Sequence, residues 1–119
     1  MRKNHFAAFD TAYHGFASGD LDKDAYALRL FAKHTDRLFL AQSFSKNFGL
    51  YGERAGTLSV MCSDESEVEK VTSRIKQVAR PMYSNPPING ARIVDTVLGD
   101  AKLFESWKLD LIVMSDRIK

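Results

Sequence analysis

The sequence is poor in the residues that mark several large classes of protein. Among its 119 residues there is one cysteine, Cys62, so no disulfide can form within the chain, and a reducing compartment is the simpler expectation. A packed thiol at a strand end is favoured for Cys62, because no cationic partner is evident beside it. No apolar run approaches the roughly 20 residues of a membrane-spanning helix. The sequence therefore predicts no association with a membrane.

The sequence also lacks a large excess of either positive or negative charge. The chain has 17 lysines and arginines and 15 aspartates and glutamates, interspersed, with a formal net charge of +2. Without a basic block, no nucleic-acid partner is predicted. His5, His14 and His34 lack the spacing of metal ligands, so no metal site is predicted. The glycines form neither a GxGxxG motif nor a P-loop, which argues against a dinucleotide or ATP site.

What the sequence does contain is enough apolar residues for one ordinary core. Hydrophobic residues make up 45% and charged residues 27% of the chain, as in typical globular proteins. Apolar runs predict buried strands over residues 6–9, 37–41 and 57–62. Apolar residues at helical spacing predict helices over residues 21–32, 68–80, 87–99 and 103–118.

Residues at the ends of these segments support the helix predictions. Asp20 or Asp22 can cap the first helix, and Asp64 with Glu67 resembles a capping pair for the second. Because the residue before a proline avoids helical geometry, the second helix is expected to end at Arg80, before Pro81. Residue 87 is a proline that can open the third helix, which Gly99 ends.

The order of these segments predicts an α/β fold. Strands separated by helix-length connections pair in a parallel or mixed sheet with helices over its faces. Three short strands also leave sheet edges that nothing in this sequence can pair. We therefore expect a partial domain, with mostly parallel strands, covering helices and an incomplete sheet.

Residues 43–54 (SFSKNFGLYGER) are the most informative segment. Lys46 is framed by hydroxyl residues and glycines and follows the predicted strand 37–41, at the end of the strand where open α/β sheets place their ligands. A lysine that forms a Schiff base needs a sheltered seat, and an anionic cofactor needs a guanidinium such as that of Arg54 nearby. The alternative is a surface lysine after a strand, the commoner fate of any single lysine.

Three separated motifs resemble one known family. They lie at residues 10–19 (DTAYHGFASG), 43–54 and 80–92 (RPMYSNPPINGAR). In order and separation they resemble the central part of the aspartate aminotransferases, fold-type I enzymes that depend on pyridoxal 5′-phosphate. Nearly the whole chain is covered by this resemblance.

The resemblance implies a role for each motif residue. Lys46 would carry the cofactor as a Schiff base and move the substrate proton, and Asp10 would keep the cofactor's ring nitrogen protonated. Tyr13 would donate to the phenolic oxygen, and Arg54 with Ser43 would hold the phosphate. Taken alone, Asp10 reads as a loop or cap residue and Tyr13 as a half-buried core ring.

The resemblance implies a substrate residue as well. Arg80 would bind the side-chain carboxylate of a dicarboxylic amino acid or 2-oxo acid, and in this family it reaches into the site of the partner subunit of a homodimer. Without the motif that follows it, Arg80 reads as a helix-end arginine that stabilises the last carbonyls. Tyr51 and Trp107 are expected to be core or interface aromatics.

The resemblance also implies what surrounds this stretch in the family. Residues 1–119 would be a fragment of the cofactor-binding large domain, without the amino-terminal segment and the carboxyl-terminal small domain. Two hypotheses follow: a transaminase acting on aspartate and 2-oxoglutarate, or a truncated, non-catalytic fragment that associates with full-length subunits. The expected compartment is the cytoplasm, with the mitochondrion as the alternative.

Overall fold

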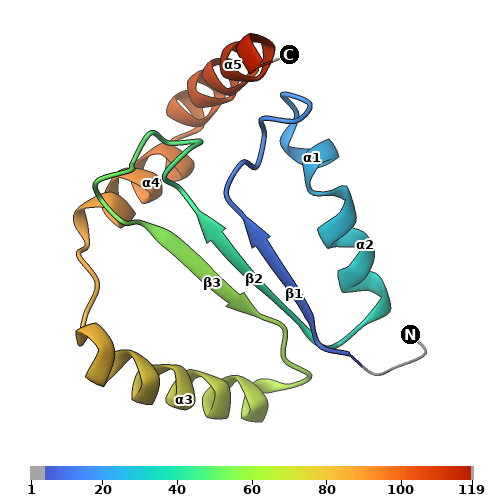
Figure 1. The fold of residues 1–119 in the computed structure, drawn as a ribbon, viewed down its shortest axis with the longest axis vertical. Helices are drawn as coiled ribbons and strands as arrows, with labels where there is room; N and C mark the ends of the chain where they lie inside the picture. The colour runs from blue at the N-terminus through green and yellow to red at the C-terminus, as the bar shows by residue number, and fades with distance from the viewer. Residues whose placement is uncertain (1–4, 119) are drawn as a thin grey trace.

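The computed structural model describes residues 5–118, which contain one small sheet with helices at its sides and ends (Figure 1). Within this range no helix combines the length and the hydropathy that crossing a bilayer requires. In chain order the elements are β1 (Ala7–Thr11), α1 (Leu21–Asp24), α2 (Tyr26–His34), β2 (Leu38–Ser43), β3 (Gly56–Val60), α3 (Glu65–Tyr83), α4 (Asn89–Gly99) and α5 (Ala101–Ile118).

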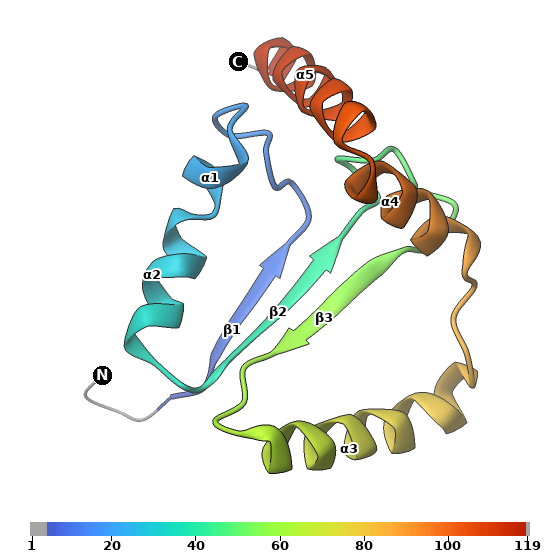
Figure 2. The ribbon, with the colours of Figure 1, turned by 180° about the vertical axis from the view of Figure 1, so that it is seen from behind.

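The sheet is mixed and has the order β1-β2-β3. β1 runs parallel to β2, with Asp10 opposite Ala41, whereas β3 runs antiparallel to β2, with Ser43 opposite Gly56. The predicted α/β class and all three strands are confirmed. Because β1 and β2 are parallel, their carboxyl ends meet at the same edge of the sheet, on the side of α4 and α5 (Figures 1 and 2).

The helix predicted over residues 21–32 is two helices. α1 and α2 are separated at Ala25, whose φ of −79° and ψ of −3° interrupt the regular ladder. Asp20 caps α1 by accepting from the backbone N–H groups of Asp22 and Lys23, at 2.9 and 3.1 Å. The apolar spacing thus predicts the helical segment and its cap, but it does not reveal the break.

The capping pair predicted for α3 is confirmed at both of its positions. The backbone N–H of Glu67 donates to Asp64 at 2.8 Å, and the Glu67 carboxylate accepts in return from the backbone N–H of Ser63 at 2.6 Å. These bonds satisfy donors that the first turn of a helix otherwise leaves unpaired.

The predicted end of α3 at Arg80 is wrong, since the helix continues through Pro81 to Tyr83. A proline removes one backbone hydrogen bond, and on an exposed helix the carbonyl that loses its donor can bind water. The helix ends instead at Ser84, whose φ is 63° and whose N–H reaches the carbonyls of Ala79 and Arg80.

Two further boundaries move by a few residues. α4 begins at Asn89 rather than at the proline two residues before it, with Ile88 in the capping position. β3 ends at Val60, so Cys62 lies just past the strand, half-buried, with its sulfur 3.8 Å from the carbonyl oxygen of Val60. Element ends are the part of a fold that periodicity predicts least well.

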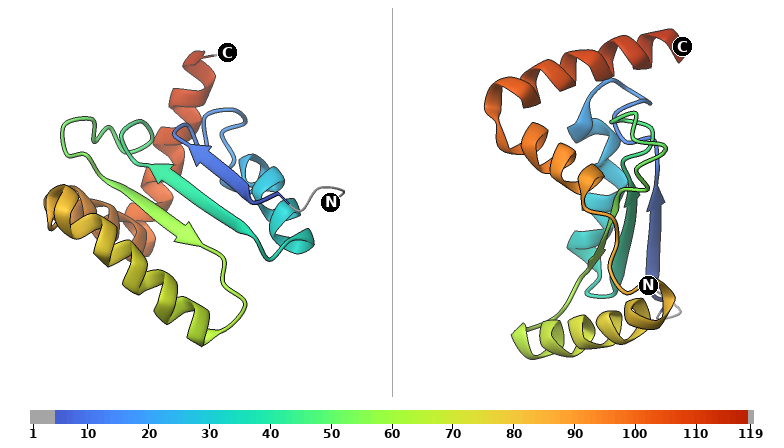
Figure 3. Two further views of the ribbon diagram at one scale, coloured as in Figure 1. Left: turned by 60° about the horizontal axis from the view of Figure 1, so that its bottom comes forward. Right: turned by 90° about the vertical axis from the view of Figure 1, so that its left-hand side faces the viewer.

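The molecule is more open than its length requires. Its radius of gyration is 16.1 Å, against roughly 13.5 Å for a compact domain of this size. Its accessible surface is 8995 Å², against roughly 6,500 Å² for a folded monomer of this mass. The strands were expected to be buried, but among their residues only Leu38 is. The described helices cover the sheet only in part, and α3 lies apart from the other helices, beyond β3 (Figures 1 and 3).

The tightest packing lies where α5 crosses the loops that follow β1 and β2 (Figure 3, right). We call this region, formed by residues 13–18, residues 44–49 and α5, the loop–α5 junction. Its most buried side chains are those of Leu111, Asn47 and Ser115, exposed by 1%, 2% and 0%. Residues that are far apart in the sequence are therefore held together on the side of the sheet where the candidate site lies.

Candidate functional site

The sheet brings three of the predicted site residues to one end. Asp10 is the fourth residue of β1 and pairs with Ala41, two residues before Ser43 at the end of β2. Arg54 precedes β3, which pairs antiparallel with β2 and therefore starts beside the end of β2. Three segments of the chain thus deliver a carboxylate, a hydroxyl and a guanidinium to the same end of the sheet.

These side chains border one open hollow of about 600 Å³, which we call the strand-end hollow. It combines acidic, hydroxyl and cationic groups with the segment after α3; among its lining residues are Asp10, Ser43, Ser45, Arg54, Tyr83 and Asn85. A guanidinium together with hydroxyls is a donor set suited to a phosphate or carboxylate. A carboxylate in the same hollow suits a protonated ring nitrogen. The residues present therefore fit an anionic, pyridine-type cofactor.

Arg54 has an unusual backbone conformation. Its φ is 53°, in the left-handed region that residues other than glycine adopt only in a small minority of cases. Its Nη1 atom donates to the carbonyl of Tyr51 at 3.2 Å, which draws the side chain back over its own turn. Strained backbone of this kind concentrates at binding sites, where it aims a side chain. Here it accompanies a guanidinium at the hollow's rim.

Lys46 lies on the turn directly after β2, as its sequence position predicts. The turn is closed by the hydroxyl of Ser43, which accepts from the backbone N–H of Ser45 at 3.2 Å. The Lys46 ammonium lies 4.3 Å from the ring centre of Tyr51 and 5.9 Å from that of Tyr13. An ammonium over an aromatic face is electrostatically favourable. The structure thus brings Lys46 and Tyr13 together.

The side chain of Lys46 borders a different hollow from Asp10 and Arg54. This second hollow, of about 630 Å³, is lined by Lys46, Tyr51 and residues of α4 and α5 such as Trp107 and Asp110. The preceding residue, Ser45, is buried and borders the strand-end hollow. The turn is therefore adjacent to both hollows, and the conformation of the long Lys46 side chain determines which hollow its amine reaches.

Arg80 is not brought to this site by the described residues. It is exposed on α3, and the residues of that region that border the strand-end hollow are Tyr83, Asn85, Pro86 and Pro87. The segment following Arg80 therefore contributes to the hollow, whereas the arginine itself does not line it.

Sequence reasoning missed two aromatic contacts with the Lys46 turn. Tyr51, for which a core or interface position is predicted, is 56% exposed in this chain, and its ring faces the Lys46 amine. Trp107 is half-buried and donates through Nε1 to the carbonyl of Asn47 at 2.8 Å. No spacing rule links a loop tyrosine five residues after a lysine, or a helix 60 residues away, to that lysine.

An α/β layer with a cation, hydroxyls and a carboxylate beyond parallel strands is the architecture of enzymes that hold an anionic ligand at the strand ends. The family model described as "Aminotransferase class I and II" matches residues 1–119. The chain belongs to this family.

Curated relatives agree with this assignment over the whole chain. The chain is 54% identical over 119 residues to the chloroplastic aspartate aminotransferase of Arabidopsis thaliana, covering 100% of this chain and 26% of the relative. It is 53% identical over 117 residues to the cytoplasmic aspartate aminotransferase of Gallus gallus, covering 98% of this chain and 28% of the relative. The chain thus spans about a quarter of the length of these relatives.

Solved structures match the fold with similar coverage. The broad specificity aminotransferase from Leishmania mexicana superimposes with a TM-score of 0.95 at 47% identity, over 98% of this chain and 29% of that one. An aromatic amino acid aminotransferase from Psychrobacter sp. B6, cocrystallised with aspartic acid, gives a TM-score of 0.90 at 45% identity, over 95% of this chain and 28% of that one. The chain therefore has the fold of part of an aminotransferase.

Proposed function

We propose that this chain belongs to an aspartate aminotransferase, which transfers the amino group between L-aspartate and 2-oxoglutarate and yields oxaloacetate and L-glutamate. The observation that carries the proposal is the strand-end hollow, where Asp10, Ser43 and Arg54 meet beside the turn of Lys46. Relatives at 53% and 54% identity bear the name of this enzyme. Family membership implies pyridoxal 5′-phosphate as the cofactor, and a related Burkholderia pseudomallei enzyme is covalently bound to it.

The phosphate end of the cofactor would be bound by Arg54 and Ser43. The guanidinium offers two parallel N–H donors to an anionic oxygen pair, and the serine hydroxyl adds a third donor. Both residues border the strand-end hollow. Asp10, on the same hollow, would hold the proton on the ring nitrogen, since a carboxylate beside that nitrogen favours its charged form.

The bound cofactor supplies an electron-withdrawing ring that accepts the electron pair left on the substrate carbon after deprotonation. Lys46 would move the proton, since its amine would attach the cofactor before the substrate arrives and would act as general base and acid afterwards. Tyr13 would donate a hydrogen bond to the phenolic oxygen of the bound cofactor. Its proximity to the Lys46 amine, 5.9 Å from the ring centre, supports this role.

Arg80 would bind the side-chain carboxylate of the dicarboxylic substrate from the partner subunit of a homodimer. Its exposure on α3, away from the hollow of its own chain, agrees with a role outside its own subunit. The large accessible surface of the chain is consistent with extensive coverage by further protein.

Residues 1–119 would form a fragment of the cofactor-binding large domain, in line with coverage of 26% to 28% of the relatives. The alternative is a non-catalytic fragment that associates with full-length subunits, and the exposed edges of β1 and β3 favour it for the isolated chain. For the compartment we propose the cytoplasm, with the organelles as alternatives, because the relatives include cytoplasmic, mitochondrial and chloroplastic enzymes.

The experiment is reductive trapping with borohydride in the presence of pyridoxal 5′-phosphate, followed by peptide mapping. It is run on the 119-residue chain and on the protein as its gene encodes it. We expect the label on Lys46 in the encoded protein, and a loss of turnover of at least about 100-fold in Lys46→Ala with cofactor binding still detectable. If Lys46 is labelled in neither protein, the proposed aminotransferase function is contradicted. If it is labelled only in the encoded protein, the 119-residue chain by itself is better described as a non-catalytic fragment.

Substrate class is tested with a matched pair on α3. Arg80→Leu should cost about 2–5 kcal/mol in kcat/KM for aspartate, the scale of a lost charge pair, and much less for an aromatic amino acid. Arg74→Leu removes another arginine of the same helix, one that bonds to Gln77, and should leave both values within about twofold. Unchanged aspartate kinetics in Arg80→Leu would remove Arg80 from the site.

A further inference from the structure

One side chain of α5 contacts both residues that follow Lys46. The indole N–H of Trp107 donates to the backbone carbonyl of Asn47 at 2.8 Å. The indole ring stacks on Phe48, with ring centres 4.4 Å apart and planes inclined by 21°. A hydrogen bond fixes a peptide plane and a stacked ring fixes the next side chain, so Trp107 restrains the turn in two independent ways.

Asn47 extends this restraint to the loop that carries Tyr13. Its side chain is 2% exposed, and Nδ2 donates to the backbone carbonyl of His14, the residue after Tyr13, at 3.4 Å. Within the described residues its Oδ1 atom has no hydrogen-bond partner. Through the Nδ2 bond Asn47 connects the turn of Lys46 to the loop of Tyr13.

A second bond from α5 reaches the loop after β1 and offers a natural comparison. Ser115 is fully buried and its hydroxyl donates to the carbonyl of Phe16 at 2.8 Å. Trp107 and Ser115 thus make the same kind of bond, from one helix to a loop carbonyl, at the same distance. Only the bond of Trp107 ends on the turn of Lys46.

We propose that Trp107 is a positioning residue that sets the backbone from which Lys46 reaches the cofactor. The proposal rests on the proposed function, because it assumes that the Lys46 amine attaches the cofactor. The lysine side chain is long and flexible, so the position of its backbone sets the range that its amine can reach. A misplacement of a reacting group by about 1 Å can cost about 100-fold in rate, so a fixed turn is worth a dedicated contact.

The bond, rather than the packing of a large ring, is what the proposal needs. Trp107→Phe keeps an aromatic ring against Phe48 and removes the N–H donor, leaving the Asn47 carbonyl without its partner. Ser115→Ala is the matched control, because it removes a bond from α5 that ends on the loop after β1 and not on the Lys46 turn. Both variants are made in the protein as its gene encodes it.

The first readout is amide hydrogen exchange in the cofactor-free protein. The N–H groups of Phe48 and Gly49 report the turn, since they bond to the carbonyls of Phe44 and Lys46 at 3.3 and 3.1 Å. In Trp107→Phe their exchange should accelerate about fivefold to tenfold, the effect of one buried hydrogen bond. In Ser115→Ala it should stay as in the wild type, while the N–H of Phe16, bonded to Tyr13, exchanges faster.

The second readout is the concentration of pyridoxal 5′-phosphate that gives half-maximal borohydride trapping on Lys46. We expect a rise of about fivefold to tenfold in Trp107→Phe and a smaller rise in Ser115→Ala, whose bond ends on the loop of Tyr13 rather than on the Lys46 turn. Wild-type values in Trp107→Phe overturn the inference, as does an equal rise in both variants, which would mean general destabilisation. If the wild type is not trapped at all, the proposed function fails, and the exchange experiment still decides whether Trp107 holds the turn.

Discussion

α5 and α3 are helices of nearly equal length, 18 and 19 residues, yet they are packed very differently. α5 buries Leu111 and Ser115 at the loop–α5 junction and bonds to two loops. α3 has an apolar stripe at helical spacing, but none of its side chains, all within the described residues, is buried. Its bonds to side chains and caps are local, such as those of Asp64 and Glu67.

This difference shows that apolar periodicity predicts the formation of a helix, whereas packing determines whether its apolar face is buried. The spacing of Val68, Val71, Ile75 and Val78 correctly predicts a helix with one apolar face. That face borders open grooves against β3, and Val78 remains 60% exposed. An apolar stripe therefore predicts which face of a helix is suited to burial. Whether that face is buried depends on another part of the molecule that packs against it. The junction supplies one for α5.

The largest effect that tests this comparison is expected from Leu111→Ala. Leu111 is 1% exposed and packs against the loop at Gly15, so its truncation should cost about 2–5 kcal/mol through lost burial and a cavity. The free energy of unfolding is measured in urea from the fluorescence of Trp107, the chain's one tryptophan, which lies in the junction.

Ile75→Ala on α3 is the matched variant. Ile75 is 40% exposed, and its truncation in the 119-residue chain should cost less than about 1 kcal/mol because less surface is withdrawn from water. Equal costs for the two variants would remove the distinction between the packed and the open helix.

The next effect concerns the loop that α5 covers. Gly15 has a φ of 93°, and a Cβ there would lie 3.1 Å from side-chain atoms of both Leu111 and Leu21. Gly15→Ala should therefore destabilise the chain by about 1–3 kcal/mol, from backbone strain and crowding together.

Gly52→Ala provides the control in the turn before β3. A Cβ at Gly52 would meet nothing within 4 Å, and its φ is not in the left-handed region. We expect a change within about 0.5 kcal/mol, in either direction. A neutral Gly15→Ala would mean that the junction can relax, and that its packing is looser than its burial indicates.

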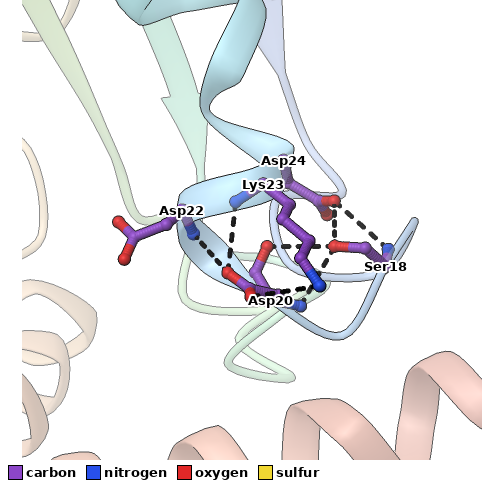
Figure 4. A network of polar contacts seen from close by, with 5 residues as sticks. All are labelled: Ser18, Asp20, Asp22, Lys23 and Asp24. Carbon is purple, nitrogen blue, oxygen red and sulfur yellow. Dashed lines mark hydrogen bonds and ion pairs between the residues drawn. The ribbon is translucent and has the colours of Figure 1, made fainter.

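A smaller effect is expected from the acidic residues of α1. The carboxylate of Asp24 accepts from the backbone N–H groups of Gly15, Ala17 and Ser18, at 2.9, 3.1 and 3.2 Å, and from the Ser18 hydroxyl at 2.7 Å. Figure 4 shows its bonds with Ser18. Asp24→Ala should cost about 1–2 kcal/mol, since these donors then depend on water.

Asp22, two residues earlier, is the comparison. It points away from this network in Figure 4 and pairs with Arg29 at 2.6 Å across an exposed surface. Asp22→Ala should change the unfolding free energy by less than about 0.5 kcal/mol, as exposed ion pairs do. The free energies of unfolding of both variants are measured by urea titration. Similar losses would show that water replaces the hydrogen bonds of Asp24 without a cost in stability.

The comparison also explains how much of the site could be predicted from sequence. Asp10 and Ser43 were placed at strand ends by apolar runs, and parallel pairing then brings strand ends together. The Asp64 and Glu67 cap has a local signature of its own. The contact between Trp107 and Asn47 has no local sequence signature, because its acceptor is a backbone carbonyl, a group that every residue carries. Arg80 was assigned from resemblance, and its place in a site needs a second chain.

The smallest expected effect is a pH dependence that again separates the two regions. The backbone N–H of Ser63, helped by its hydroxyl, holds the pKa of Glu67 below the ordinary 4.5, and the backbone N–H of Lys23 holds the pKa of Asp20 below 3.8. A lowered carboxyl pKa stabilises the fold above its unfolded value, and this stabilisation is lost as pH falls through the folded value.

Because the unfolded value of Glu67 is the higher one, α3 should begin to lose stability at a higher pH than α1. Circular dichroism between about pH 6 and pH 3 should therefore record an early loss of helix from α3. Glu67→Gln keeps an acceptor for Ser63 but cannot ionise, so its early helix loss should be smaller than in the wild type. If Glu67→Gln follows the wild-type curve, the cap does not set the acid response of α3, and the open helix is held by something other than its first turn.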